Sequence, residues 1–269
     1  MAIQTPGAVR FARSLWRILM GRPRVPQSLE ENALLQTILQ RRSVRQFKPD
    51  AVPEDVFQAI LEAGRLAPST VNLQTWSFAV FDAASWQQRF SRPMPFRGSR
   101  AVIVIADTGR DRQVLDVFPY SPLVEYTIGV MNASLAAMNM TIAAEALGVS
   151  SVMLSETGRS GILDAKYLKG CLGLPEHTVA LMTIVFGYAR GAYPPMPPKL
   201  PAGQIFFDGR YASPDREELQ DWLDQMVAGY KASHIRSSFV SQLEIYRTKI
   251  DQAERDLTEM VYFKEKPES

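Results

Sequence analysis

The sequence is poor in the side chains that build metal sites and disulfides. It has one cysteine, Cys171, and two distant histidines, His177 and His234, in 269 residues. A single thiol excludes an internal disulfide, and so few sulfur and imidazole groups exclude a Cys/His metal centre. Free thiol usage of this kind is typical of a reducing, cytoplasmic protein. We therefore expect no metal site and a cytoplasmic location.

Neither sign of charge dominates. The chain has 30 Lys and Arg residues against 28 Asp and Glu residues, which leaves a formal net charge of +2. Such a balance gives no chain-wide attraction to nucleic acid, so we expect no nucleic-acid partner. The hydrophobic fraction of 46% and the charged fraction of 22% are those of a globular protein with a real core.

Long uninterrupted hydrophobic runs are also missing. The longest uncharged run in the middle of the chain, residues 126–144, contains the polar residues Asn132, Ser134, Asn139 and Thr141. We interpret it as a buried core helix rich in Ala and Met rather than a membrane span.

Acidic residues are absent from the first 29 positions. Within residues 8–20, Arg10, Arg13 and Arg17 share one helical face and apolar residues share another. This pattern predicts a basic amphipathic helix. It would pack on its own protein or a partner subunit, or make a peripheral contact with an anionic membrane surface.

Hydrophobic periodicity then predicts an alternation of helices and short strands. The predicted helices cover residues 29–41, 53–66, 122–147 and 161–172, and the predicted strands cover residues 76–81, 101–106, 150–154 and 179–188. Beyond residue 213 the chain is charged and helical. A heptad seam from Phe239 to Met260 indicates a helix that docks either on a partner subunit or within its own chain. We expect three parts: an N-terminal extension (1–28), a central domain (29–212) and a helical C-terminal extension (213–269).

Two local clusters could carry chemistry. The first, residues 41–45, combines Arg41, Arg42 and Arg45 with the hydroxyl of Ser43, a set that suits a phosphate group but is equally found on solvated surfaces. The second, residues 67–76, joins a helix to a strand with small and amide side chains. These could bond the edge of a planar heterocycle or simply form a polar turn.

Together and in this order, the clusters resemble the opening of the FMN-dependent nitroreductase family. Later segments continue the likeness to about residue 210: NMTIAAEALG (139–148), LGLP (172–175), FGY (186–188) and KLP (199–201). The resemblance implies an α+β fold with three α-β-α layers around a mixed, mainly antiparallel sheet. It also implies an FMN cofactor and an oxidoreductase that uses NADH or NADPH.

The resemblance also assigns site residues. Arg41, Ser43 and Lys199 correspond to ligands of the FMN phosphate, with Arg42 in the same cluster, and Arg45 to a cation near the pyrimidine side of the flavin. The flavin-pocket segment that the partner subunit supplies corresponds to Pro68, Ser69, Thr70 and Asn72. Ser155 and Glu156 correspond to the backbone donor to flavin N5.

Three departures from the family pattern stand out. Thr75 replaces a proline that often precedes the tryptophan, and Pro197 replaces a second basic residue two positions before Lys199. The Ser155-Glu156 pair replaces a pair that usually contains glycine. These changes predict weaker FMN binding and put the N5 contact in question; Glu156 could equally be a gate, a substrate contact or a solvated side chain.

The implied mechanism transfers hydride from NAD(P)H through the flavin to a small organic acceptor such as a nitroaromatic, a quinone or an activated alkene. It needs no catalytic acid or nucleophile from the chain. We expect His177 on the surface because it follows a Leu-Pro-Glu turn, and Cys171 in core packing because it lies in an apolar helix. The resemblance further implies a homodimer with flavin sites at the interface, in which the Ala- and Met-rich helix 122–147 packs closely against its partner.

Two alternatives remain open. One is a specialised flavoenzyme of the same fold that performs reductive dehalogenation or flavin fragmentation, for which a substrate-binding lid between residues 107 and 126 would be a sign. Residues in that stretch could grip a polar substrate or form a solvated loop: Asp111, Arg112, Tyr120, Glu125 and Tyr126. The other alternative is a flavin-binding protein without turnover.

Overall fold

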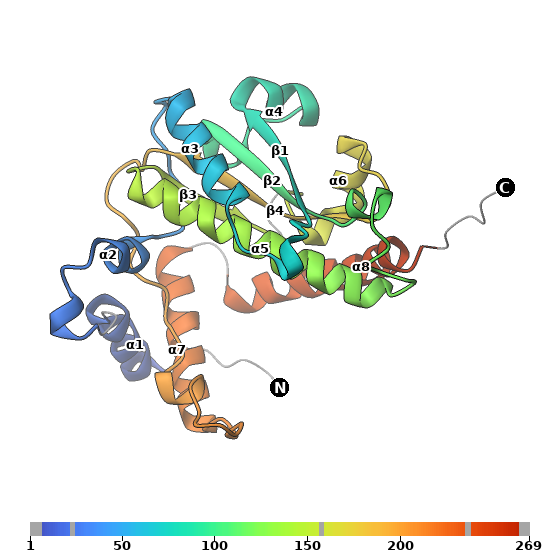
Figure 1. Ribbon diagram of the computed structural model, residues 1–269. Helices are drawn as coiled ribbons and strands as arrows, with labels where there is room; N and C mark the ends of the chain where they lie inside the picture. The colour runs from blue at the N-terminus through green and yellow to red at the C-terminus, as the bar shows by residue number, and fades with distance from the viewer. Residues whose placement is uncertain (1–6, 22–24, 156–158, 235–237, 264–269) are drawn as a thin grey trace. The chain divides into compact units, whose positions relative to one another are not determined.

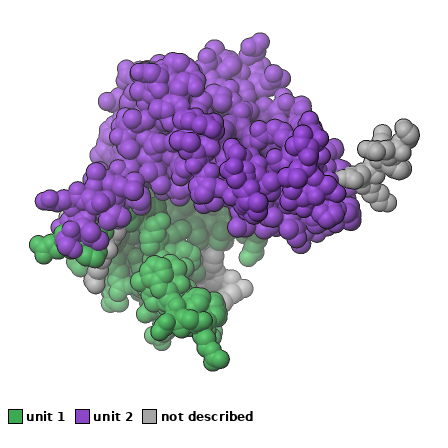
Figure 2. Space-filling view, in the orientation of Figure 1, with its two compact units in different colours: residues 1–27, 194–248 green, residues 28–193, 249–269 purple. Residues whose placement is uncertain are grey.

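The computed structural model describes residues 7–21, 25–155, 159–234 and 238–263. The chain divides into two compact units, one of residues 1–27 and 194–248 and the other of residues 28–193 and 249–269 (Figure 2). All candidate site residues except Lys199 belong to the second, larger unit.

A four-stranded sheet organises the larger unit (Figure 1). Its spatial order is β1 (Trp76–Asp82), β2 (Arg100–Asp107), β4 (Thr178–Gly187) and β3 (Ser150–Leu154). All three strand pairs are antiparallel. An isolated parallel bridge between Ser43 and Ser151 extends the sheet beyond β3. The predicted mainly antiparallel sheet is therefore confirmed, and the parallel pairing comes from the arginine-rich segment.

Helices cover both faces of this sheet. On one face, α3 (Glu54–Arg65) and α5 (Pro122–Ala146) share a core with Val102 and Val104 of β2. On the other face, α4 (Ala83–Phe90) and α6 (Ala165–Leu172) share a core with Ala101 and Ile103. Alternate residues of a strand point to opposite faces, so β2 contributes to both cores. The predicted three-layer α-β-α fold is confirmed.

The long helix α5 is a core helix. Its alanines at 133, 136, 137 and 144 and Met140 have no exposed surface. A Cβ atom built on Gly64 would lie 2.7 Å from Met140 Cγ, so only glycine lets α3 approach α5 this closely. These residues pack within the chain, so a contact of α5 with a partner subunit would use its exposed residues, such as Met138, which is 44% exposed. By length and composition alone, α5 could also cross a membrane, a test that buried core helices meet as well.

Two short helices show how local chemistry sets the boundaries. The predicted helix 29–41 begins later, at Ala33 in α2 (Ala33–Gln40), because the Asn32 side chain accepts a hydrogen bond from Leu35 N and caps it. Helix α4, which the sequence pattern did not reveal, starts with a reciprocal capping box between Asp82 and Ser85.

The smaller unit contains α1 (Ala8–Met20) and α7 (Arg216–Ser233). The predicted basic helix α1 lies along α7, where Arg17 pairs with Asp221 and Arg10 Nη1 lies 3.6 Å from Asp224 Oδ2. Two guanidiniums of the basic face thus meet carboxylates of the same chain.

Helix α8 (Phe239–Val261) belongs to the smaller unit up to Thr248 and to the larger unit from Lys249 onward. The last part of the predicted heptad seam lies in the core of the larger unit, where Leu257 and Met260 pack with residues of α5 and the sheet. Docking within the chain, one of the two predicted roles of the seam, is therefore observed for this part of α8.

Candidate functional site

The arginine-rich segment lies beside strand β3. Val44 N donates to Ser151 O at 3.0 Å, and Val44 is only 4% exposed, so its apolar side chain anchors the segment. Among the described residues, no carboxylate forms a salt bridge with Arg41, Arg42 or Arg45, which leaves their charge available for an anion.

Arg42 differs from its neighbours. Its Nη1 donates to Leu39 O at 2.6 Å and to Arg41 O at 2.8 Å. These acceptors are at the carboxyl end of α2, where carbonyl groups lack partners within the helix. The Arg42 guanidinium therefore caps the end of α2. Within the described residues, the side chains of Arg41 and Ser43 form no hydrogen bond or salt bridge.

A half-buried acid lies close to this segment. Burial raises the pKa of Glu145, and a hydrogen bond from Tyr193 and the charges of Arg41 and Arg42 partly oppose this rise. The Tyr193 hydroxyl lies 3.3 Å from Glu145 Oε2 and 2.8 Å from Ser150 Oγ. These contacts connect the end of α5 with the first residue of β3.

The second candidate segment, residues 69–75, has an unusual backbone. Val71, Asn72 and Gln74 all have positive φ angles, of 49°, 58° and 54°. Left-handed backbone is costly for a β-branched residue such as Val71, and strain of this kind concentrates at functional sites. The Val71 side chain is nevertheless 87% exposed. Pro68, Thr70 and Asn72 are also exposed, so this strained loop presents its candidate residues outward.

Polar contacts from two elements hold the loop in place. From α5, Asn132 bonds Thr70 and the buried Thr75. From the segment after β2, Arg110 Nη2 donates to Gln74 O at 3.3 Å and also to Trp76 O. Within the loop, Gln74 N donates to Ser69 Oγ at 3.0 Å.

The remaining candidates lie at the end of β3 and in the smaller unit. Ser155 directly follows β3 and is exposed, while Glu156 lies outside the described residues. A Cβ atom on Gly161 would lie 2.4 Å from Ser155 O, so the chain returns to Ser155 six residues later through a close backbone contact. Lys199 belongs to the smaller unit.

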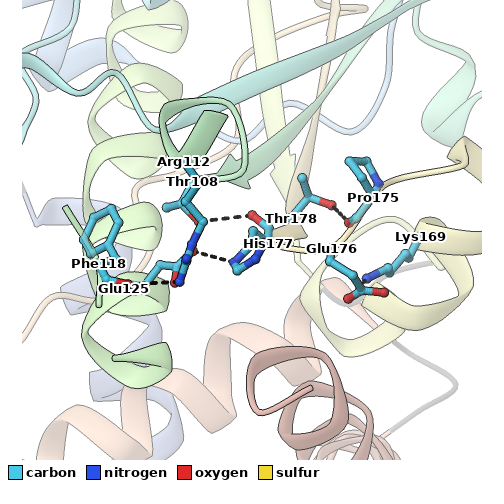
Figure 3. Close-up of polar contacts among 9 residues, drawn as sticks. All are labelled: Thr108, Arg112, Phe118, Glu125, Lys169, Pro175, Glu176, His177 and Thr178. Carbon is cyan, nitrogen blue, oxygen red and sulfur yellow. Dashed lines mark hydrogen bonds and ion pairs between the residues drawn. The ribbon is translucent and has the colours of Figure 1, made fainter. Parts of the chain in front are cut away.

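A buried polar cluster surrounds Glu125, near the start of α5 (Figure 3). The carboxylate accepts hydrogen bonds from Thr108 Oγ1 and from Arg112, whose Nη2 lies 3.1 Å from Oε2. His177 Nδ1 lies 2.8 Å from Oε1. Burial would raise the pKa of Glu125, but the bonds from Arg112 and Thr108 and the nearby His177 lower it overall.

The cluster borders a cavity of about 40 Å³. Apolar walls come from α5, the sheet and the end of α8, including Tyr126, Val179 and Met260. The Phe263 ring contacts His177 edge-on, with centroids 4.7 Å apart. A cavity of this size has room for a few water molecules, and it is far smaller than the roughly 300–1,000 Å³ of a typical small-molecule site.

The sequence identified Arg112 and Glu125 as candidate residues but not His177. The expectation of a surface His177 is wrong, since its side chain is 17% exposed and bonded to Glu125. Arg112 and Glu125 were left open between a substrate grip and a solvated loop, and they are paired with each other inside the protein. The sequence places Arg112 and Glu125 within 13 residues of each other, so their pairing could be considered from sequence alone. The contact of His177 with Glu125 could not, because the two residues are 52 positions apart. Cys171 is partly buried on α6 and packs against the core, as expected.

Comparison with known proteins places this architecture in a family. The model of the family described as "Nitroreductase family" matches residues 38–188, more than half of the chain. The chain belongs to the nitroreductase family.

Individual relatives agree with this assignment. An Archaeoglobus fulgidus protein whose name includes "NAD(P)H nitroreductase" is 30% identical over 193 residues, which are 70% of this chain and 98% of that protein. A Vibrio harveyi protein named "NADPH-flavin oxidoreductase" is 26% identical over 78% of this chain and 87% of its own length.

Solved structures share the fold. The structure of B. megaterium NfrA2 has a TM-score of 0.72 and 21% identity, and the match covers 87% of this chain and all of that one. The V. harveyi NADPH:FMN oxidoreductase complexed with NAD⁺ has a TM-score of 0.63 and 23% identity, with 81% of this chain and 98% of that chain covered.

Proposed function

We propose that this protein is an FMN-dependent oxidoreductase that passes hydride from NAD(P)H to a small organic acceptor. Family membership supports a redox enzyme, and the relatives named as NAD(P)H nitroreductase and NADPH-flavin oxidoreductase support this donor and this cofactor. The FMN in the name of the V. harveyi structure supports FMN as the flavin. The acceptor we propose is a nitroaromatic, a quinone or an activated alkene.

One observation carries the proposal: the bridge between Ser43 and Ser151 aligns the arginine-rich segment with β3. The proposed phosphate ligands near the start of this strand and the backbone donor of Ser155 just after its end then lie along one sheet edge. The donor chemistry fits FMN, because Arg41 and Arg45 offer guanidiniums without a carboxylate partner among the described residues, and Ser43 offers a hydroxyl.

Each part of the site has a defined task in this proposal. When bound, FMN supplies the two-electron redox chemistry. Arg41 and Ser43 bind its phosphate, and Arg42 supports them by closing α2. Arg45 places a positive charge near the pyrimidine edge, which favours the negative charge of the reduced ring. The Ser155 backbone N–H, with Glu156 next to it, orients the ring, and the loop from Pro68 to Asn72 shields the ring of the second subunit from water.

We also propose a homodimer. Large apolar side chains on α2 and α5 are exposed, among them Leu34, Met131 and Leu135, which are 60%, 56% and 45% exposed. A further copy of the chain would cover these side chains and the exposed Val71 of the strained loop. In this arrangement each loop completes the partner's flavin pocket. Sedimentation of the full-length protein tests the dimer.

We propose a cytoplasmic location and a peripheral membrane contact through residues 8–20. The contact would use the apolar stripe of α1, where Trp16 and Leu19 are 62% and 70% exposed. Since Arg10 and Arg17 pair with α7 carboxylates, binding to vesicles should depend little on anionic lipid. Co-sedimentation with neutral and with anionic vesicles tests this prediction.

The absorbance spectrum of the purified protein tests the enzymatic proposal. Flavin bands near ~370 and ~450 nm that bleach on anaerobic addition of NADH or NADPH, and recover with a quinone, are the expected result. Bound flavin that neither nucleotide reduces would overturn the oxidoreductase and favour a specialised or non-catalytic flavoprotein. Colourless protein that FMN does not reconstitute would overturn the cofactor assignment.

A further inference from the structure

Two arginines outside the candidate flavin site converge on one tyrosine. Arg92 follows α4, which ends at Ser91 in a left-handed conformation, and Arg159 lies between β3 and α6. Their Cζ atoms lie 6.0 Å and 4.9 Å from the ring centroid of Tyr167 on α6. Arg92 Nη2 also donates to Arg159 O at 3.1 Å, which joins the two segments.

The charge of this pair is not balanced within the described part of the chain. Neither guanidinium forms a salt bridge there, and the Nε–H of Arg92 is buried without a hydrogen-bond acceptor. An unpaired buried donor is costly, and two unbalanced positive charges beside one ring attract an anion. Contacts with the faces of Tyr167 and, for Arg92, Phe90 offset only part of this cost. An anion bound here would balance the positive charge and accept a hydrogen bond from the unpaired donor.

The backbone around this pair is firmly fixed. Ser160, next to Arg159, is completely buried, and its carbonyl accepts a hydrogen bond from Thr183 of β4 at 2.6 Å. Arg159 itself has a positive φ of 56°. The close contact of Gly161 with Ser155 holds the same segment against the residue to which we assign the flavin ring.

We infer that Arg92 and Arg159 form a binding site for a phosphate monoester, supplied by the 2′-phosphate of NADPH. This inference rests on the proposed function, because Ser155 is assigned to the flavin ring over which nicotinamide stacks. The adenosine end of an extended dinucleotide lies away from that ring, and NADH lacks the 2′-phosphate. Two guanidiniums match the oxygens and the double charge of this group. The pair would thus select NADPH over NADH.

Steady-state kinetics of flavin-loaded Arg92→Gln and Arg159→Gln test the assignment. Each is expected to raise the KM for NADPH about tenfold or more, because a charge-assisted hydrogen bond is lost, while the KM for NADH and kcat change less than about twofold. Arg92→Lys and Arg159→Lys keep a charge and should retain part of the preference for NADPH. Arg89→Gln is the matched control, since Arg89 is also on α4 but donates only to Cys171 O at 3.4 Å.

Binding of 2′-AMP, adenosine and inorganic phosphate to the full-length protein, measured by calorimetry, gives a readout independent of turnover. The expected order is 2′-AMP tighter than phosphate, with no measurable adenosine binding, and a loss of 2′-AMP affinity in both Gln variants. Phosphate binding that depends on these arginines, with an unchanged NADPH to NADH ratio, would identify free phosphate as the ligand and overturn the dinucleotide assignment. Equal effects on NADPH and NADH would overturn the phosphate site. Absence of flavin reduction would instead contradict the proposed function while the 2′-AMP result stands.

Discussion

The side-chain amide of Asn132 on α5 joins both ends of the strained loop. Its Nδ2 donates to Thr75 Oγ1 at 2.8 Å, and its Oδ1 accepts from Thr70 N at 3.1 Å and from Thr70 Oγ1 at 3.2 Å. Asn132 and Thr75 are 1% and 0% exposed. Thr75, one of the departures from the family pattern, thus has a defined partner. The hydroxyl that replaces the proline ring is what Asn132 binds.

We predict that Asn132→Ala destabilises the protein and loosens the loop. The variant leaves the buried Thr75 hydroxyl and the Thr70 amide without their partner, which costs about 1–3 kcal/mol of unfolding free energy. Because the loop carries proposed flavin-pocket residues, flavin affinity should also fall. Urea unfolding and fluorescence titration with FMN measure the two effects.

Asn139→Ala is the control, because Asn139 is also on α5 and donates to Ala63 O of α3 at 3.1 Å. It should lower the unfolding free energy by a comparable amount without a change in flavin affinity. Equal flavin loss in both variants would mean that the Asn132 effect comes from general instability rather than from the loop.

A second prediction concerns the two glycines that flank Tyr167 in the chain. Gly161→Ala would place a Cβ 2.4 Å from Ser155 O and 2.5 Å from Ser155 Cα, so the backbone must move. We expect a loss of stability of about 1–3 kcal/mol, as for other overpacked sites. In contrast, a Cβ on Gly170 of α6 meets nothing within 4 Å. Gly170→Ala should stabilise the helix by about 0.5–1 kcal/mol. Thermal unfolding of both variants checks the pair, and a neutral Gly161→Ala would contradict the close contact with Ser155.

The sheet could be predicted from the sequence because its strands are short apolar runs between turn signals. The strand 150–154 was predicted with its observed boundaries, and the other three differ by one residue at one or both ends. Helix α4 could not be predicted because only two of its residues, Trp86 and Phe90, are buried, which is too few to give a periodic apolar pattern. Its start depends on the capping box at Asp82, which is a side-chain geometry rather than a periodic pattern.

The candidate site was predictable only where a motif is continuous in sequence. The segments 41–45 and 67–76 could be found in this way. Pairs formed by residues far apart in the chain could not, as Glu125 with His177 and Arg92 with Arg159 show, because their contacts arise from tertiary packing. The sequence also could not distinguish Arg42 from Arg41 and Arg45. Its role in capping the carboxyl end of α2 becomes visible only when the end of that helix is known.

A third prediction separates Arg41 from Arg42. Arg41→Gln should weaken FMN binding about tenfold or more, because a charge-assisted hydrogen bond to phosphate is lost, with little change in stability. Arg42→Gln removes the donor to Leu39 O and Arg41 O, so it should lower the melting temperature. Its effect on FMN affinity should be the smaller of the two. FMN titration and calorimetric melting of both variants test this division, and the reverse pattern would assign the phosphate to Arg42.

The last prediction concerns the pH dependence that Glu125 gives to stability. The folded state lowers the pKa of this carboxyl from its ordinary value of 4.5, so folding favours the ionised form. The resulting stabilisation is present above about pH 4.5, the value in the unfolded chain, and is lost as the pH falls through the lowered folded pKa. Glu125→Gln removes the buried negative charge that faces Arg112 and His177. It should therefore cost about 2–4 kcal/mol at pH 7.

In acid, wild type and Glu125→Gln should converge, because the protonated wild-type carboxyl has also lost its charge. Urea unfolding at a series of pH values from 7 down to 3 measures this convergence. Glu176→Gln serves as the control, since Glu176 pairs with Lys169 at 2.8 Å on the surface and its side chain is 55% exposed. Water reaches this pair through Glu176, although the Lys169 side chain is 19% exposed. The pair should therefore contribute about 1 kcal/mol or less, and the control should stay closer to wild type at pH 7 than Glu125→Gln does. A difference between wild type and Glu125→Gln that stays constant down to pH 3 would show that Glu125 acts through packing alone, and the ionised carboxylate would then have no part in holding Arg112 and His177 together.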